Sequence, residues 1–91
     1  MSKYELISKL EAYLKENKIP KCTAVMVNLD SFQSVDNYVE VFVMVELTTT
    51  LEEKEEINDM LDDMFPGIYF DVGALNVKKA NWSRLWKAPQ S

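Results

Sequence analysis

The strongest constraint on the fold is a run of alternating apolar residues near the middle of the chain. The apolar positions are Val39, Val41, Val43, Val45 and Leu47. A period of two places such side chains on one face of a β-strand, and β-branched residues suit a pleated surface. The positions between them are Tyr38, Glu40, Phe42, Met44 and Glu46. Because this second face is half apolar, the strand is predicted to be central in a sheet or covered by a partner.

Two helices are predicted, one on each side of this strand in the sequence. Residues 2–17 carry an apolar stripe at helical spacing, and Ser2 with Glu5 matches a capping box at its start. Residues 50–65 begin with a second capping box, Thr50 with Glu53, and Pro66-Gly67 ends the helix. The residues expected to form its buried stripe are Ile57, Met60, Leu61, Met64 and Phe65.

Further strands are predicted over residues 22–29 and 68–77, which gives the order α-β-β-α-β. Strands joined by a short loop pair antiparallel, and a strand-helix-strand crossover gives a parallel pair. We therefore expect an α+β two-layer sandwich, in which a three-stranded mixed sheet carries both helices on one face. Its 91 residues suit a single domain, with residues 1–77 as the core and residues 78–91 as a basic tail. The tail places Trp82, Leu85 and Trp86 at helical spacing, so it is predicted to be a short amphipathic segment.

The charge is distributed unevenly along the chain. Fifteen acids against ten bases give a net charge of −5. Residues 1–29 hold five lysines and three acids (+2), and residues 72–91 hold four bases and no acid (+4). Residues 30–71 hold twelve acids and one base, which is a net charge of −11. An acidic middle therefore lies between two basic ends.

Most of this acidity falls on the second predicted helix. Six of its carboxylates lie within about 120° of arc, opposite the apolar stripe, because each residue turns the helix by about 100°. We call this set the carboxylate ridge: Glu52, Glu55, Glu56, Asp59, Asp62 and Asp63. Like charges three or four residues apart cost roughly 0.2–0.5 kcal/mol per pair. Helix stability alone would therefore not select this face.

Two explanations of the carboxylate ridge stay open. The general one is that a charged face keeps the protein soluble. The sharper one is that the ridge imitates the phosphate backbone of DNA. Its charges are spaced roughly one per 3 Å of helix, while duplex DNA carries about one per 1.7 Å, so two ridges in a symmetric dimer would approach the duplex value. The remaining acids that could extend such a surface are Asp30, Asp36, Glu40, Glu46 and Asp71.

The residues for catalysis and for cofactor binding are missing. The chain has no histidine, which excludes histidine-based catalysis and histidine metal sites. Cys22 has no histidine to activate it and is interpreted as a buried structural residue. Gly67 and Gly73 stand alone, so there is no glycine-rich phosphate loop. The loop from Asp30 lacks the glycine and glutamate of an EF-hand. We expect a protein that is not an enzyme and that binds no cofactor and no metal.

The half-apolar face of the central strand predicts an interface. Phe42, Met44 and Met26 would be exposed there if both helices cover the valine face, and exposed apolar patches commonly mark contacts. A homodimer through this face is the favoured solution, and the tryptophan tail folding over it is the alternative. Aromatic and basic residues are also mixed in the tail, as in single-strand binders. The favoured interpretation is that both tryptophans pack a terminal element onto the core, without direct binding of nucleic acid.

Two absences bear on location. The N-terminus has no apolar segment typical of a signal peptide, and no stretch approaches the roughly 18 apolar residues that span a bilayer. A single cysteine suits a reducing compartment. The sequence therefore predicts a cytoplasmic protein without membrane association.

In composition and element order, the chain resembles small acidic phage-encoded DNA-mimic inhibitors. These include the antirestriction nuclease (Arn) family of T-even phages and some anti-CRISPR proteins. No shared motif carries the resemblance. It implies an inhibitor, in the host bacterial cytoplasm, that occupies the DNA site of a basic restriction, CRISPR or nucleoid protein. The alternative is an interaction module, such as an immunity protein or a transcription regulator, that acts through apolar contacts.

Overall fold

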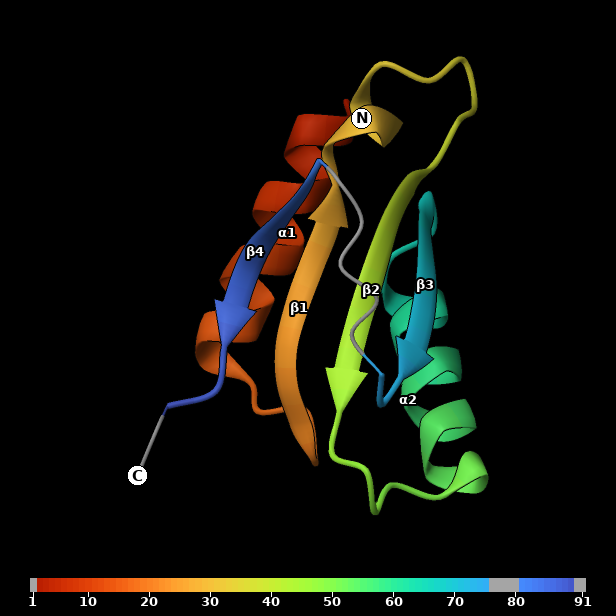
Figure 1. The fold of residues 1–91 in the computed structure, drawn as a ribbon. Coiled ribbons are helices and arrows are strands. Elements are labelled where there is room, and N and C mark those ends of the chain that lie inside the picture. Colours follow the sequence, from red (N-terminus) through yellow and green to blue (C-terminus); the bar gives the residue numbers. More distant parts are fainter. Residues whose placement is uncertain (1, 76–80, 90–91) are drawn as a thin grey trace.

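The computed structural model describes residues 2–75 and 81–89 and shows an α+β fold (Figure 1). Two α-helices and four β-strands follow one another along these residues, with one 3₁₀ turn. The elements are α1 (Lys3–Glu16), β1 (Cys22–Asn28), η1 (Leu29–Phe32), β2 (Val39–Val45), α2 (Leu51–Met64), β3 (Ile68–Gly73) and β4 (Trp82–Lys87). No helix in the described part of the chain is long and apolar enough to span a bilayer.

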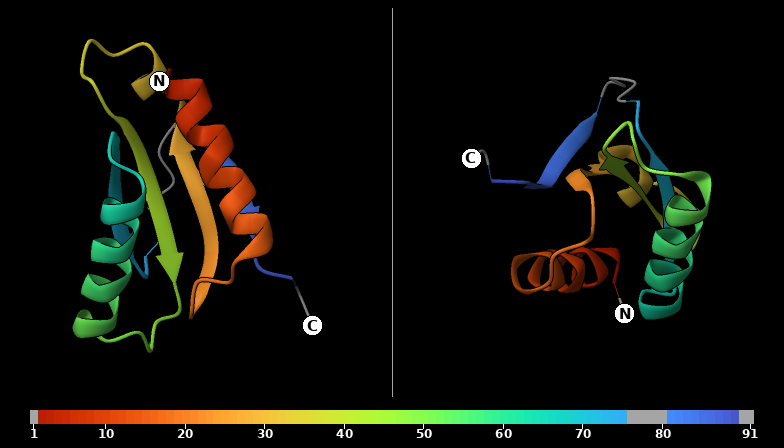
Figure 2. Two further views of the ribbon diagram at one scale, coloured as in Figure 1. Left: turned by 180° about the vertical axis from the view of Figure 1, so that it is seen from behind. Right: turned by 90° about the horizontal axis from the view of Figure 1, so that it is seen from below.

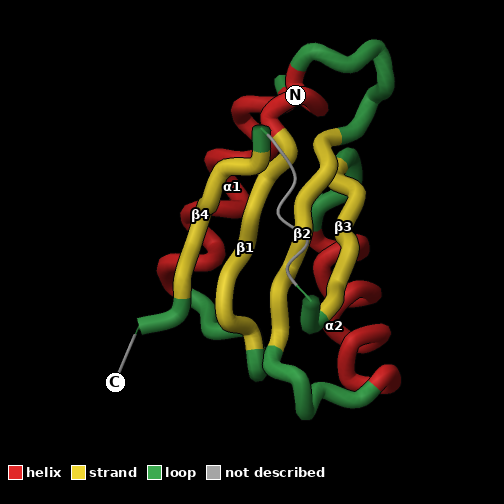
Figure 3. The backbone as a smooth tube through the Cα atoms, viewed as in Figure 1, coloured by secondary structure: helices red, strands yellow, loops and turns green. Residues whose placement is uncertain are grey.

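The strands form one mixed sheet in the order β3-β2-β1-β4 (Figure 3). β1 pairs antiparallel with both β2 and β4, and β2 pairs parallel with β3. The expected central position of the valine-rich strand is confirmed, because β2 lies between β1 and β3. Of the predicted third strand, residues 68–73 are confirmed as strand, residues 74–75 follow its end and are not strand, and residues 76–77 lie outside the described part.

The prediction of three strands is wrong, because residues 82–87 form a fourth strand at the edge of the sheet rather than a separate tail. The misleading feature is a β-bulge. Val25 pairs with Trp86 and Met26 pairs with Arg84, which leaves Leu85 as an extra residue. Both Leu85 and Trp86 pack against the core as a result. Two adjacent apolar residues on one face break the period of two, so the segment imitates helical spacing in the sequence.

Both helices lie on one face of the sheet, as expected (Figure 2). Their caps follow the sequence. The Ser2 hydroxyl accepts from the Glu5 amide, and Thr50 and Glu53 form both bonds of a capping box. The helix-facing valines of β2 are fully buried, whereas Leu47 is 80% exposed because β2 ends at Val45. The placement of Leu47 on the buried face was therefore wrong.

The buried stripe of α2 is narrower than the sequence indicated. Ile57 and Leu61 are buried and Phe65 packs against the core, but Met60 and Met64 are 37% and 41% exposed. Met60 and Met64 lie only about 20° around the helix from Glu53, whose contact with Lys21 places this flank of α2 toward β1. α2 packs on β3 and, among the described residues, makes few contacts with α1, so the flank with the methionines stays open.

This strand order divides the molecule by charge. β2, α2 and β3 form one half and derive from residues 30–71, whose net charge is −11. α1, β1 and β4 form the other half. In residues 2–29 and 81–89 that half holds seven bases and three acids, which is +4. Segments with the same sign of charge, far apart in the sequence, therefore lie side by side (Figure 1).

Candidate functional site

The carboxylate ridge lies on the outer side of α2. All six of its residues are exposed, while the opposite side of the helix holds the buried Ile57 and Leu61. Because Ile57 and Leu61 face the sheet, the ridge on the opposite side of α2 points away from it; Figure 2 shows that α2 lies on one face of the sheet. The predicted separation of a core face and a carboxylate face on this helix is therefore confirmed.

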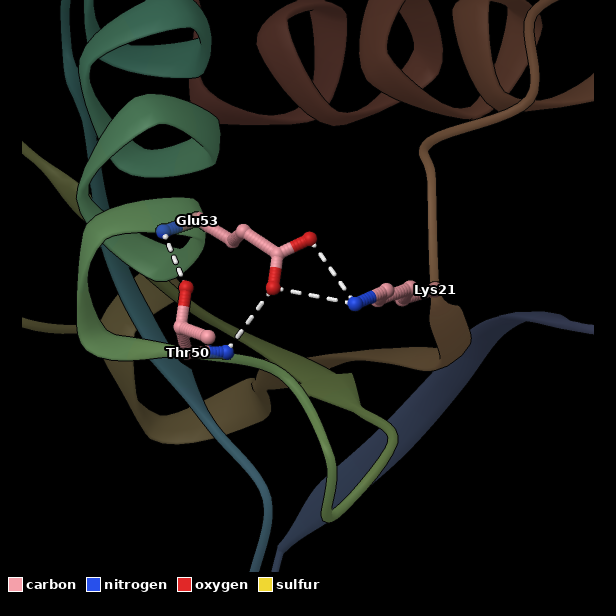
Figure 4. Close-up of polar contacts among 3 residues, drawn as sticks. All are labelled: Lys21, Thr50 and Glu53. Carbon is pink, nitrogen blue, oxygen red and sulfur yellow. Dashed lines mark hydrogen bonds and ion pairs between the residues drawn. The ribbon is translucent and has the colours of Figure 1, made fainter.

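Glu53 is the one carboxylate of this region that is bound within the fold (Figure 4). Its Oε1 accepts from the Thr50 amide at 3.0 Å, and Lys21 Nζ lies 2.9 Å from Oε1 and 2.8 Å from Oε2. The hydrogen bond from Lys21, followed by those from Thr50, lowers the pKa of Glu53 from 4.5 to about 2. Glu53 therefore serves the start of α2 rather than the outer surface.

The other acids do not prolong the carboxylate ridge into one continuous surface. Glu40 and Asp71 lie on the opposite face of the sheet from the helices, because they alternate with the buried positions of β2 and β3. Glu46 is exposed just after β2, and its amide donates to Lys21 O. The acidic half thus carries carboxylates on both sides of the sheet.

Three of these acids line a separate shallow hollow beside η1. The hollow has a volume of about 160 Å³, and it is lined by Asn28, Asp30, Ser31, Ser34, Asp36, Tyr38 and Glu40. The side-chain amide Nδ2 of Asn81 donates to both carboxylate oxygens of Asp30, at 3.2 and 3.3 Å. In residues 2–75 and 81–89, no three carboxylates or thiols are grouped so that they could hold a metal ion.

The three residues of the predicted dimer face do lie together. Met26 pairs with Phe42 in the β1–β2 register, and Met44 follows on the same face of β2. All three side chains are half-buried rather than fully exposed. A dimer through this face would carry its two carboxylate ridges on opposite outer sides, because the helices cover the other face of each sheet. Two separate acidic surfaces would result.

Cys22 and the tryptophans have structural positions. Cys22 is buried, and desolvation raises the pKa of its thiol to about 11, although a hydrogen bond to Ala24 opposes this shift. Trp86 packs against the core on the helix side. Trp82 pairs with Asn28, and Arg84 with Met26, which places them on the opposite face of the sheet. The expectation that a tryptophan fastens a terminal element to the core is confirmed for Trp86.

The sequence reasoning missed the exposed flank of α2. Met60 and Met64 lie one turn apart beside the carboxylate ridge, and methionine is an adaptable residue in binding surfaces. The available signal was the apolar stripe itself, which is wider than the side of α2 that holds the buried Ile57 and Leu61. Comparisons with protein families, with curated proteins and with solved structures gave no match to this chain.

Proposed function

We propose that the protein is a non-catalytic inhibitor whose carboxylate ridge occupies the DNA-binding site of a basic host protein, of the restriction, CRISPR or nucleoid type. The observation that carries this proposal is the exposure of all six ridge carboxylates on one side of α2. Asp62 and Asp63 lie in the last turn, where the helix dipole disfavours negative charge. These carboxylates destabilise the helix that carries them, and binding to another molecule would explain why they are present.

The charge division supports the same proposal. A positively charged DNA site attracts the acidic half over a distance of about a Debye length, and the basic half turns away from it. Contacts of this kind release counterions, so the affinity falls steeply as salt is added. The ridge of one chain is sufficient for the proposal, which does not require the predicted homodimer.

The test is competition with duplex DNA. The immobilised protein is incubated with bacterial lysate, and bound proteins are eluted with duplex DNA and identified. The captured protein is then purified, and its DNA binding is measured with and without this chain. The triple variant Glu55→Lys, Asp59→Lys and Asp62→Lys should abolish the displacement of DNA. If the triple variant still displaces DNA, the carboxylate ridge is not the binding surface and serves only as a solvated face of the protein.

A matched control separates the effect of the carboxylate ridge from the effect of total net charge. Glu5→Lys, Glu11→Lys and Glu16→Lys on α1 change the total charge by the same amount, on the other half of the molecule. This variant should displace DNA as well as the natural sequence does. Circular dichroism and thermal unfolding of both variants establish that they are folded.

A second candidate function is favoured by Met60 and Met64, which are exposed beside the ridge. An interaction module would bind its partner mainly through such apolar side chains. Its affinity would then change little between low and moderate salt, and Met60→Ala with Met64→Ala would weaken it more than the lysine reversals. The salt dependence of binding to the captured protein distinguishes the two functions.

A further inference from the structure

The two open edges of the sheet differ in how they are protected. Edge strands commonly avoid pairing with other chains through bulges, lysines or prolines. β4 carries a bulge at Leu85 and the cations Arg84 and Lys87. β3 pairs with β2 without any register shift, and it contains no lysine, arginine or proline. Of the two edges, β3 is the one built to accept another strand.

The outer side of β3 offers unpaired backbone groups. The Val39 amide donates to Gly67 O at 3.0 Å. Because a parallel ladder repeats every two residues, the peptide groups of Tyr69 and Asp71 face β2. Those of Phe70 and Val72 therefore face outward. In the described residues no strand pairs with this side of β3.

Carboxylates flank this edge on both sides. Asp71 is exposed on the face of β3 away from the helices. On the helix side, the contact of Glu53 with Lys21 shows which flank of α2 faces β1. Glu55 and Asp62 lie roughly 160–180° around the helix from Glu53, so they are on the flank toward the outer edge of β3. Lys54 lies on the same flank, between the buried stripe and these carboxylates. With three carboxylates against this one cation, an extended chain along β3 would still meet a net negative charge.

A second copy of this protein fits the edge poorly. Pairing β3 with β3 of another copy would bring two acidic halves together, with Asp71 near its counterpart. Pairing β3 with β4 of another copy would match the charges, but the bulge at Leu85 interrupts the ladder on that strand. An extended segment rich in lysine or arginine has the matching charge and no such interruption.

We propose that the outer edge of β3 binds an extended, lysine- or arginine-rich segment of the partner protein as a fifth strand. Main-chain hydrogen bonds to Phe70 and Val72 would hold the segment, and Asp71, Glu55 and Asp62 would select its charge. This inference rests on the proposed function only for the identity of the partner, which is the same basic protein.

The test uses a ten-residue peptide of alternating lysine and valine as the probe. Amide hydrogen exchange is followed by NMR with and without the peptide, at low salt. At saturation the exchange rates of the Phe70 and Val72 amides should fall by at least about tenfold. A peptide of the same sequence, N-methylated at its four central residues, should leave their exchange unchanged. A peptide in which glutamate replaces every lysine should not bind.

Each other outcome overturns this inference in a recognisable way. If both lysine peptides bind equally well and Phe70 and Val72 stay unprotected, the attraction is electrostatic and involves the carboxylate ridge alone. If the peptide does not bind, the edge is not a strand acceptor. If these amides gain protection with protein concentration alone, the occupant is a second copy. In all three cases the competition with DNA still tests the proposed function separately.

Two variants locate the contact. Asp71→Lys should weaken peptide binding about three- to tenfold, while Glu16→Lys, the same charge change on α1 in the other half of the molecule, should weaken it less. Val72→Pro should abolish the protection of Phe70, because proline removes an outward donor that β2 does not use. Val72→Thr is its matched control and keeps the donor. Should Val72→Pro not fold, the N-methylated peptide still decides the question.

Discussion

The Nζ atom of Lys21 lies 2.8 Å from Oε2 of Glu53, and this ion pair joins the residue before β1 to the first turn of α2 (Figure 4). Lys21 adopts a positive φ of 62°, and its carbonyl accepts from the Glu46 amide. One residue thus contacts both the end of β2 and the start of α2. The contact connects the basic half of the molecule with the acidic half.

Removal of the Glu53 charge should show this contact in the pH dependence of stability. The folded-state pKa is lowered from 4.5 to about 2, so the stabilisation is complete above pH 4.5 and is lost as the pH falls toward 2. Glu53→Gln should therefore lower the melting temperature at pH 7 and make little difference near pH 2. Glu52→Gln, which changes an exposed carboxylate, is the control for charge. Equal differences at both pH values would contradict the prediction.

Neutralising the end of the carboxylate ridge should stabilise the protein. Asp62→Asn with Asp63→Asn removes two repulsive pairs with Asp59 and two charges at the negative end of the helix dipole. We expect a gain of about 1–2 kcal/mol in the free energy of unfolding at low salt. Urea denaturation at low salt and in 1 M salt checks this, and the gain should shrink with screening. A loss of stability would show that these carboxylates serve the fold.

Adjacent residues of α2 should differ strongly in their contribution to stability. Leu61 is fully buried, so Leu61→Ala should cost about 2–5 kcal/mol. Met60→Ala is the control and should cost less than about 1 kcal/mol, because its side chain is 37% exposed. Chemical denaturation of both variants measures the difference. Similar costs would mean that α2 is rotated about its axis.

Trp86 and Trp82 should also differ in their contribution to the stability of the fold. Trp86→Ala removes a side chain packed against the core and should cost about 1–3 kcal/mol. Trp82→Ala should cost less, because Trp82 lies on the other face of the sheet at its edge. Thermal unfolding followed by circular dichroism makes the comparison. A larger effect of Trp82 would indicate that the face opposite the helices contributes most to holding β4.

Cys22 should react slowly until the protein unfolds. A thiol with a pKa of about 11 has roughly a hundredfold less thiolate at pH 8 than an unperturbed cysteine. Alkylation by iodoacetamide, followed by mass spectrometry, should therefore be at least that much slower in the native protein than in urea. Native labelling at the unfolded rate would show that the start of β1 opens readily.

The sequence predicted the elements whose side chains alternate regularly or carry a local signature. Examples are the valines of β2 and the capping box of Thr50 with Glu53, because both depend on near neighbours in the chain. It could not reveal the bulge at Leu85, which depends on pairing with a strand some sixty residues away. It also could not reveal the exposure of Met60 and Met64, which depends on where α2 lies over the sheet. The carboxylate ridge was predictable because it belongs to one helix, and the place of Glu40 on the opposite face follows from its alternation with the valines. The place of Asp71 beside Phe42 depends on the register of β3 against β2.

The division of charge between the two halves gives the molecule a permanent electric moment directed across the strands. In the field of a positively charged surface, such a moment produces a torque as well as an attraction. The protein would therefore rotate during its approach and arrive with α2 and β3 in front. Productive orientation before contact raises the rate of association without adding any contact to the final complex.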